Sequence, residues 1–131
     1  MFVDASAIIA IIANEKEGGD ILARLDAASN CFTSPIAVYE ASLGLARALC
    51  LPIEDAERFV GSLLKGKQTE IVPIRAKTCA IALDAFSRFG KGNHPARLNM
   101  GDCFAYACAR ELQVPLLFKG NDFAQTDIEP A

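Results

Sequence analysis

The sequence predicts a three-layer α/β/α sandwich with a central parallel sheet. Four short apolar segments lack the polar–apolar alternation of a strand with one wet face, which indicates strands buried on both sides. Segments with the apolar spacing of helices separate them, and this alternation of strands and helices favours parallel pairing. With 131 residues and no internal repeat, we expect a single domain over residues 1–131.

The predicted elements follow one another in the order that this fold requires. The expected strands are short apolar runs at 1–3, 31–33, 69–74 and 115–118. The expected helices cover 6–13, 19–28, 36–49, 52–67, 75–90 and 99–113. Residues 121–131 have turn character, with an edge strand expected near Asp127 and Ile128.

Local signals support several of these boundaries. Ser34 followed by Pro35 is a strong helix start, because serine caps the first N–H groups and proline fits the first helical position. Asn99 is a second candidate N-cap residue, and Gly90 ends the preceding helix. The stretch 90–99, rich in glycine and basic residues, is the one clear loop.

Composition and charge narrow the class of protein. The net charge of −3 argues against a protein that wraps duplex DNA by charge alone. The same net charge is compatible with a nuclease, since bound metal ions can supply positive charge at a phosphate. The five cysteines form no CxxC pair, which argues against a zinc site or a disulfide framework and for a reducing compartment.

The start of the chain is not expected to be a targeting signal. Its first apolar stretch, 5–13, has no basic segment before it and is far shorter than the ~20 residues that span a bilayer. We therefore expect a cytoplasmic protein that does not enter membranes.

Two aspartates follow strands of the predicted sheet. Asp4 comes directly after the first strand, and Asp122 comes a few residues after the last. Open parallel sheets bind ligands just beyond the carboxyl ends of their strands, so both aspartates are candidate ligands. Each also has a structural alternative, because aspartate is a good N-cap residue and Gly120-Asn121-Asp122 is good turn sequence.

Two further acids lie on predicted helices. Glu40 shares a helix face with Ile36 and Leu43, and a carboxylate on an apolar face is costly unless it is paired or binds a metal. The structural alternative is an ion pair with Arg47. Asp102 opens a helix that is apolar nearly all round and is expected at the mouth of the core, although the helix dipole alone also favours an acid there.

These four acids define a candidate metal site. Carboxylates gathered at one sheet edge repel one another unless a cation neutralises them or some of them take up protons. Oxygen ligands without histidine or cysteine favour hard ions, so we expect Mg²⁺ or Mn²⁺ rather than zinc. The reaction suited to Asp4, Glu40, Asp102 and Asp122 around such an ion is phosphodiester hydrolysis.

The basic loop carries the remaining candidates. Lys91, His94 and Arg97 lie in it, and cations on a mobile loop suit contacts with RNA phosphates. His94 is the only histidine, and a role as general base is the less favoured alternative.

Taken together, these segments resemble the PIN-domain family. FVDASAII, with Asp4 and Ser6, is similar to the opening of PIN domains, and SPIAVYEASLGLARAL is similar to their second motif, centred on Glu40. The segment from His94 to Ile128 resembles the last third of VapC toxins, the nuclease half of VapBC toxin–antitoxin pairs. The resemblance covers essentially the whole chain, and GDCFAYA and KGNDF are its most specific parts.

The resemblance implies a PIN fold, Mg²⁺- or Mn²⁺-dependent endoribonuclease activity, homodimers, and inhibition by a cognate VapB antitoxin. By position, Asp4, Glu40 and Asp102 match the three main acids of the family, and Ser6 matches a polar residue that supports the first of them. Close relatives often carry two aspartates before the phenylalanine. Here the pair is Asn121-Asp122, so the fourth acidic position stays open between them.

Three other functions are alternatives to a toxin nuclease. A PIN nuclease of RNA maturation, outside toxin–antitoxin systems, fits the same residues, and so does a PIN domain that binds without cutting, although the complete set of acids argues against the latter. A receiver-type signalling domain would use an acidic Mg²⁺ pocket and a lysine such as Lys119. That alternative is disfavoured because no second acid precedes Asp4 and no mid-chain strand ends in an aspartate.

Overall fold

The computed structural model describes all residues 1–131 and contains one sheet of four parallel strands. The strands are β1 (Phe2–Val3), β2 (Phe32–Thr33), β3 (Glu70–Ile71) and β4 (Leu116–Leu117), and their spatial order is β3-β2-β1-β4. Phe2 of β1 lies in register with Phe32 on one side and Leu116 on the other. The predicted central parallel sheet is confirmed, with β1 and β4 adjacent.

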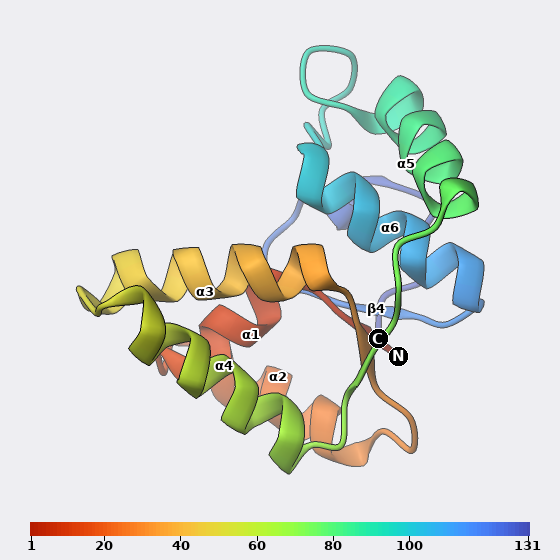
Figure 1. Cartoon of the computed structure of the whole chain (residues 1–131). Helices are drawn as coiled ribbons and strands as arrows, with labels where there is room; N and C mark the ends of the chain where they lie inside the picture. Colours follow the sequence, from red (N-terminus) through yellow and green to blue (C-terminus); the bar gives the residue numbers. More distant parts are fainter.

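Six helices cover the two faces of this sheet (Figure 1). They are α1 (Ala5–Ile12), α2 (Gly18–Ala27), α3 (Pro35–Leu49), α4 (Ile53–Gly66), α5 (Ala76–Phe89) and α6 (Met100–Leu112). The first four helices form one layer, and α5 and α6 form the other (Figure 1). Each predicted helix agrees with the structure to within one residue at either end.

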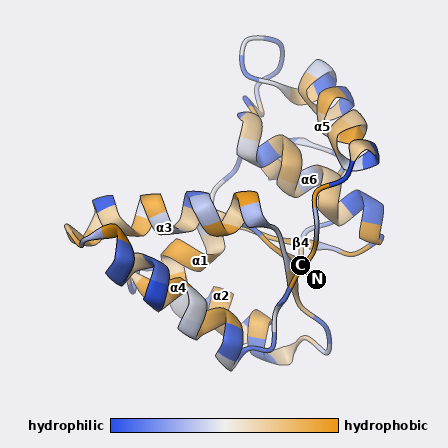
Figure 2. Ribbon diagram, in the orientation of Figure 1, coloured by the Kyte–Doolittle hydropathy of each residue, from blue (hydrophilic) through white to orange (hydrophobic).

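The alternating side chains of the strands build a separate core on each face. Phe2 and Leu116 are fully buried among residues of α5 and α6. Val3 and Leu117, one position further along, are buried among residues of α1 to α4. The largely apolar α1 and the mixed hydropathy of α4 in Figure 2 match their inner and outer places in that second layer. None of the helices has the length and hydrophobicity needed to cross a membrane.

Both predicted N-caps are confirmed. The Ser34 hydroxyl accepts the N–H of Ala37 at 3.2 Å at the start of α3. At the start of α6, Asn99 and Asp102 cap each other's backbone, since each side chain accepts the other residue's N–H. These caps fix the two helix starts that hold Glu40 and Asp102 over the sheet.

The predicted edge strand near Asp127 and Ile128 is wrong. Residues Phe123–Gln125 form a 3₁₀ helix, and only Pro130 pairs with β4, through a single bridge to Leu116. The reason is that side chains hold this segment in another conformation. Ile128 is buried and its N–H donates to the Thr126 hydroxyl at 3.2 Å, so it is not free to join a strand ladder.

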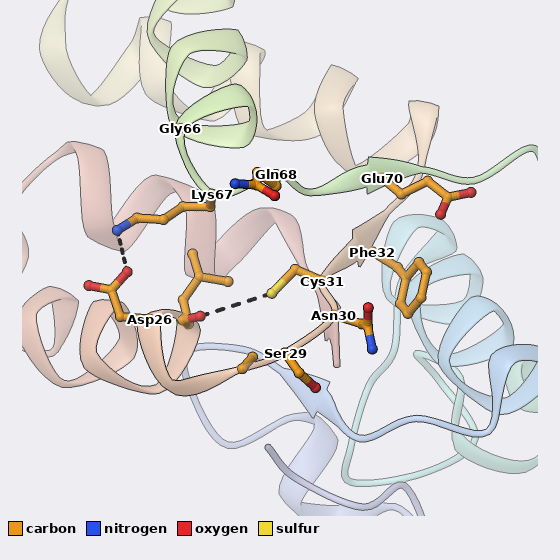
Figure 3. A pocket seen from close by; sticks show the side chains of 11 residues that line it. Asp26, Ser29, Asn30, Cys31, Phe32, Gly66, Lys67, Gln68 and Glu70 are labelled. Carbon is orange, nitrogen blue, oxygen red and sulfur yellow. Dashed lines mark hydrogen bonds and ion pairs between the residues drawn. The ribbon is translucent and has the colours of Figure 1, made fainter.

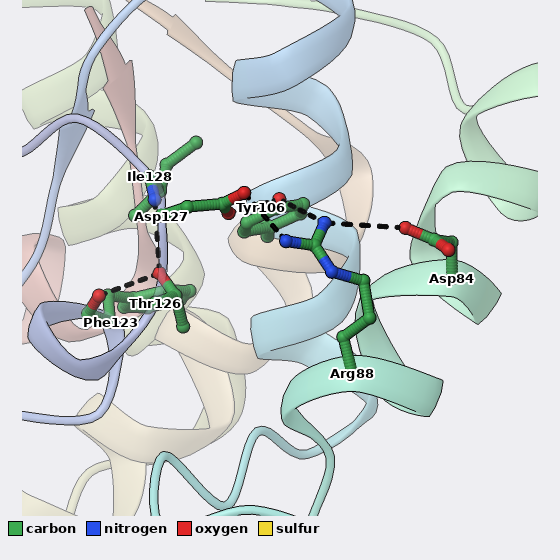
Figure 4. A network of polar contacts seen from close by, with 7 residues as sticks. All are labelled: Asp84, Arg88, Tyr106, Phe123, Thr126, Asp127 and Ile128. Carbon is green, nitrogen blue, oxygen red and sulfur yellow. Dashed lines mark hydrogen bonds and ion pairs between the residues drawn. The ribbon is translucent and has the colours of Figure 1, made fainter.

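A polar network ties the same segment to α5 and α6 (Figure 4). The buried Tyr106 donates its hydroxyl proton to Asp127 at 2.6 Å, and Arg88 donates to the other carboxylate oxygen at 2.7 Å. Arg88 also lies 3.6 Å from Asp84 on its own helix and over the ring of Phe89. The tail that carries Asn121 and Asp122 is therefore anchored at its far end.

Candidate functional site

Asp4 lies at the carboxyl end of β1, where it also caps α1. It is 4% exposed, and its Oδ2 accepts both the N–H and the hydroxyl of Ser6, at 2.9 and 2.5 Å. Its own N–H donates to the carbonyl of Leu117 at the end of β4. Asp4 is therefore an N-cap residue, as the structural alternative predicted. Because both bonds from Ser6 use Oδ2, Oδ1 is available to a ligand.

Glu40 extends from α3 to the first turn of α6. Its carboxylate lies so close to Gly101 that a Cβ added to that glycine would be 1.8 Å from Oε2. The expected alternative, an ion pair with Arg47, is wrong, because neither residue belongs to any of the ion pairs in the structure. Glu40 is half-buried, and its carboxylate has no cation beside it.

Asp102 lies in the first turn of α6, as predicted. Its Oδ2 accepts the N–H of Asn99 at 2.8 Å, so one oxygen serves the helix cap. The helix behind it is deeply buried, from Cys103 to Ala109 apart from a half-buried Phe104. Asp102 is thus held at the mouth of the core, with Oδ1 left for another partner.

The fourth position lies in the turn after β4. Gly120 adopts a positive φ of 98° there, and both Asn121 and Asp122 are exposed. The negative charge of Asp122 raises the pKa of Asp102, which brings Asp122 into the electrostatic field of the cluster. Asn121 carries no charge, and its one hydrogen bond is accepted by its backbone carbonyl from the Gln125 side chain.

Ser6 connects this turn to Asp4. Its hydroxyl donates to Asp4 Oδ2 and accepts the N–H of Lys119 at 3.0 Å. The Lys119 ammonium pairs with Glu15 and so points away from Asp4, toward the end of α1. Ser6 thereby fixes both the orientation of Asp4 and the path of the chain toward Asp122.

Burial and neighbouring charges shift the pKa values of the acids. Burial, followed by the charges of Asp4 and Asp102, raises the pKa of Glu40 to about 7. Burial, together with the charges of Asp4 and Asp122, raises the pKa of Asp102 to about 6, although the hydrogen bond from the Asn99 backbone lowers it. The pKa of Asp4 is raised by burial, although its bonds from Ser6 oppose the shift. The structure brings these four acids to one edge of the sheet.

The donor set fits a hard divalent cation in chemistry, although the acids are not yet gathered around one point. As the side chains stand, no three histidine, cysteine, aspartate or glutamate residues are close enough together to hold a metal ion. The available donors are all carboxylate oxygens, and Glu40 has no protein partner that would compete for it. The Glu40 carboxylate lies against Gly101, in the first turn of the helix that carries Asp102.

The basic residues lie apart from the acids. Lys91 and Arg97 are exposed in the loop between α5 and α6, and neither forms an ion pair (Figure 1). His94 is half-buried: its Nδ1 accepts the N–H of Ala96 at 3.1 Å, and its ring packs edge-on against Phe89. The loop leads directly into Asn99 and α6, which places its cations on the approach to Asp102 along the chain.

A polar pocket lies at the other edge of the sheet and contains none of these acids (Figure 3). Cys31, Phe32 and Glu70, at the amino ends of β2 and β3, line it, and Asp26 and Lys67 form an ion pair across its rim. Because the acids follow the carboxyl ends of the strands, this pocket is separate from the candidate site.

Sequence reasoning missed two parts of the site. Gly101 stands beside Asp102 in GDCFAYA and receives the Glu40 carboxylate, but only the distance between two helices reveals why a glycine is there. The bond between Ser6 and the backbone of Lys119 likewise depends on the adjacency of β1 and β4, which no local pattern indicates.

Comparison with known proteins places this geometry in a family. The family model described as PIN domain matches residues 1–129. The chain therefore belongs to the PIN-domain family, and the receiver-domain alternative is wrong. A crystal structure of VapC20 from Mycobacterium tuberculosis, described as a sarcin–ricin loop cleaving toxin, has the same fold, with a TM-score of 0.76, 18% identity, and coverage of 99% of this chain and 97% of that one.

Among PIN domains, the chain is similar to the VapC ribonucleases in particular. A VapC ribonuclease of Rhizobium meliloti (strain 1021) is 40% identical, over 97% of this chain and 98% of the relative. Ribonuclease VapC28 of Mycobacterium tuberculosis is 39% identical, over 100% and 97%. Ribonuclease VapC42 of the same organism is 35% identical, over 100% and 98%. These full-length matches confirm the resemblance seen in the sequence motifs.

The raised pKa values predict how the stability of the metal-free protein depends on pH. The folded state holds the Glu40 proton up to about pH 7, whereas an unfolded chain releases it near 4.5. The folded state therefore binds more protons in this window, and the free energy of unfolding should fall as pH rises from about 4.5 to about 7. Urea unfolding in EDTA across this range measures the slope.

The matched variant for this prediction is Glu40→Gln, which keeps the side-chain shape and cannot ionise. It should reduce the fall in stability with pH and be more stable than the parent at pH 8, with little difference near pH 4. A parent protein that grows more stable between pH 4.5 and 7 would contradict the assigned electrostatics.

Proposed function

We propose that this chain is the toxin of a type II toxin–antitoxin pair, an endoribonuclease whose carboxylates hold Mg²⁺ or Mn²⁺. Membership of the PIN-domain family and full-length similarity to VapC ribonucleases support the nuclease activity, and dependence on a divalent metal is part of the proposal. The identity of the metal and the roles of the individual acids are the finer parts of the proposal. In it, Asp4, Glu40 and Asp102 are the main ligands, with Asp122 as the fourth.

The observation that carries this proposal is the unpartnered carboxylate of Glu40. A half-buried carboxylate without a cation or a hydrogen-bond donor is costly to ionise, and the charges of Asp4 and Asp102 raise that cost. Structural roles account for one oxygen of Asp4 and one of Asp102, but for neither oxygen of Glu40. A divalent cation is the partner that would neutralise all of them at once.

The residues would share the work of hydrolysis as follows. A divalent cation in this site would activate a water molecule and stabilise the charge that develops on the phosphate oxygens. Ser6 holds Oδ2 of Asp4 and so aims Oδ1 into the site. Asn99 orients Asp102 in the same manner. Lys91 and Arg97 would hold neighbouring RNA phosphates, whereas His94 supports the loop fold through Ala96 rather than acting as a base.

A VapB-type antitoxin is the proposed partner, and the structure offers a surface for it. An apolar groove between α3 and α4 is lined by Val38, Tyr39, Leu43, Ile53 and Ile71. Tyr39 in this groove is 65% exposed and directly precedes Glu40 in the chain. We propose that the C-terminal segment of the antitoxin anchors apolar side chains here and presents an arginine to the acids.

The second proposed partner is another copy of this chain. Leu83, Phe86 and Met100 are exposed on α5 and α6, around a groove lined only by hydrophobic residues. An apolar patch of this kind on a protein surface marks an interaction site. We propose that this face pairs with itself in a homodimer, which leaves the groove between α3 and α4 free for the antitoxin.

A PIN nuclease of RNA maturation is the remaining alternative for the biological role. It shares the fold and the acids, so the site geometry does not separate the two. The full-length similarity to VapC ribonucleases favours the toxin. A small antitoxin reading frame directly upstream of the gene would support it further.

The first prediction of this proposal concerns the metal and its ligands. RNA cleavage should vanish in excess EDTA and return with Mg²⁺ or Mn²⁺. Asp4→Asn and Asp102→Asn should each reduce cleavage by roughly 100-fold or more, the scale expected when one group that stabilises the transition state is lost. Gel assays on a labelled RNA measure both effects, and Asp122→Asn should cost less than either.

The control for these variants is Asp20→Asn, which removes an exposed acid from α2 with the same change of charge. It should cleave at the parental rate, and circular dichroism should show all four variants folded. Undiminished cleavage in excess EDTA, or parental activity of Asp4→Asn, would overturn the metal site.

The second prediction concerns the antitoxin. Replacing the arginines near its C-terminus by alanine should weaken inhibition and restore Mn²⁺ binding by the toxin in the complex, because the guanidinium would no longer occupy the carboxylates. Calorimetric titration of the complex with Mn²⁺ gives the second readout. If inhibition and metal affinity both stay unchanged, the antitoxin acts by covering the RNA surface instead.

The third prediction concerns the dimer. Leu83→Glu together with Met100→Glu should convert a dimer into a monomer, since a buried interface does not accept unpaired charges. Light scattering after size-exclusion chromatography gives the mass of each form. Phe59→Glu on α4, which is 50% exposed, is the matched control and should stay dimeric. A monomeric parent, or a double variant that stays dimeric, would exclude this face.

A further inference from the structure

Gly101 is the second residue of α6, where Glu40 of α3 reaches that helix. A Cβ at this position would lie 1.8 Å from Oε2 of Glu40 and 2.2 Å from both Cδ and Oε1. Real Cβ atoms essentially never approach another heavy atom more closely than 3.0 Å. The Glu40 carboxylate therefore occupies the space that any other residue at 101 would fill with its side chain.

Backbone conformation does not explain a glycine here. Gly101 lies within a regular helix, outside the positive-φ region that Gly92 and Gly120 occupy. In a helix, glycine is less favourable than alanine. A Cβ at Gly61 or Gly66 of α4 would meet nothing within 4 Å. Among the glycines of the chain, only Gly101 would place a Cβ against a carboxylate. The absence of a side chain at position 101, rather than backbone flexibility, is what makes space for the Glu40 carboxylate.

We propose that Gly101 is a positioning residue for the nuclease site: its bare Cα lets the Glu40 carboxylate lie against the first turn of α6, beside Asp102. The inference rests on the proposed role of Glu40 as a metal ligand. Gly101 itself touches neither metal nor RNA in this account. It sets where the carboxylate of α3 is held relative to the carboxylate of α6.

A methyl group at position 101 would displace that carboxylate by at least about 1 Å, and a displacement of this size in an active site can cost about 100-fold in rate. The far end of a flexible glutamate can move, so the fold should survive the change. The loss should therefore appear in metal affinity and cleavage, and it should depend on the presence of Glu40.

The test is a double-mutant cycle on Mn²⁺ affinity, measured by calorimetry on the full chain. Gly101→Ala and Glu40→Ala should each weaken Mn²⁺ binding by about 10–100-fold, the scale seen when the support of a metal ligand is lost. In the Glu40→Ala background, Gly101→Ala should cause no further loss, because the methyl group then fills vacated space. Thermal unfolding of the same four proteins reports folding, and Gly61→Ala controls for a generic helical substitution.

The outcomes separate the two claims. If Glu40→Ala binds Mn²⁺ as tightly as the parent, the role of Glu40 as a ligand is wrong. If Glu40→Ala weakens binding but Gly101→Ala does not, or if their losses multiply, the positioning role of Gly101 is wrong and the site stands. If Gly101→Ala does not fold, the double variant should fold with the affinity of Glu40→Ala, and its failure to fold would also overturn the inference.

Discussion

The repulsion among four carboxylates at one edge of the sheet is the constraint around which the molecule is built. Two helix layers meet at this edge, and each contributes an acid: Glu40 from α3 and Asp102 from α6. The strands contribute the other two, since Asp4 ends β1 and Asp122 follows β4. Burial raises the pKa values of Glu40 and Asp102, and the charges of neighbouring acids raise them further. The fold must hold these groups together against that force.

The fold holds two of the acids in place by using them to cap helices. Asp4 caps α1 and Asp102 shares a capping box with Asn99, so each is held by backbone N–H groups that also stabilise its charge. Ser6 then links the Asp4 carboxylate to the turn after β4. In both aspartates one carboxylate oxygen serves the fold, and the other is the one that the proposed site assigns to the metal. Glu40 is the exception, because it has no structural partner at all.

The sequence predicted the layers, the strands and the helix ends closely, because apolar spacing and caps such as Ser34-Pro35 are local signals. Each acid was also found locally, from its place after a strand or at a helix start. The predicted edge strand failed because the buried Ile128 and the Asp127 network control that segment through distant contacts. Gly101 was missed for the same reason, since its neighbour Glu40 is far away in the sequence.

The pairing of β4 with both ends of the chain has a practical consequence. Phe2 lies in register with Leu116, and Pro130 bridges the same leucine, so residues 1 and 131 lie near each other (Figure 1). Residue 1 precedes β1, whereas Asp4 follows the carboxyl end of that strand. A short peptide could join them, and new ends could be opened in the exposed loop at 91–93. Circular permutation of this kind would place Asp102 and Asp122 ahead of Asp4 and Glu40 in the chain while leaving the order of the strands in the sheet unchanged.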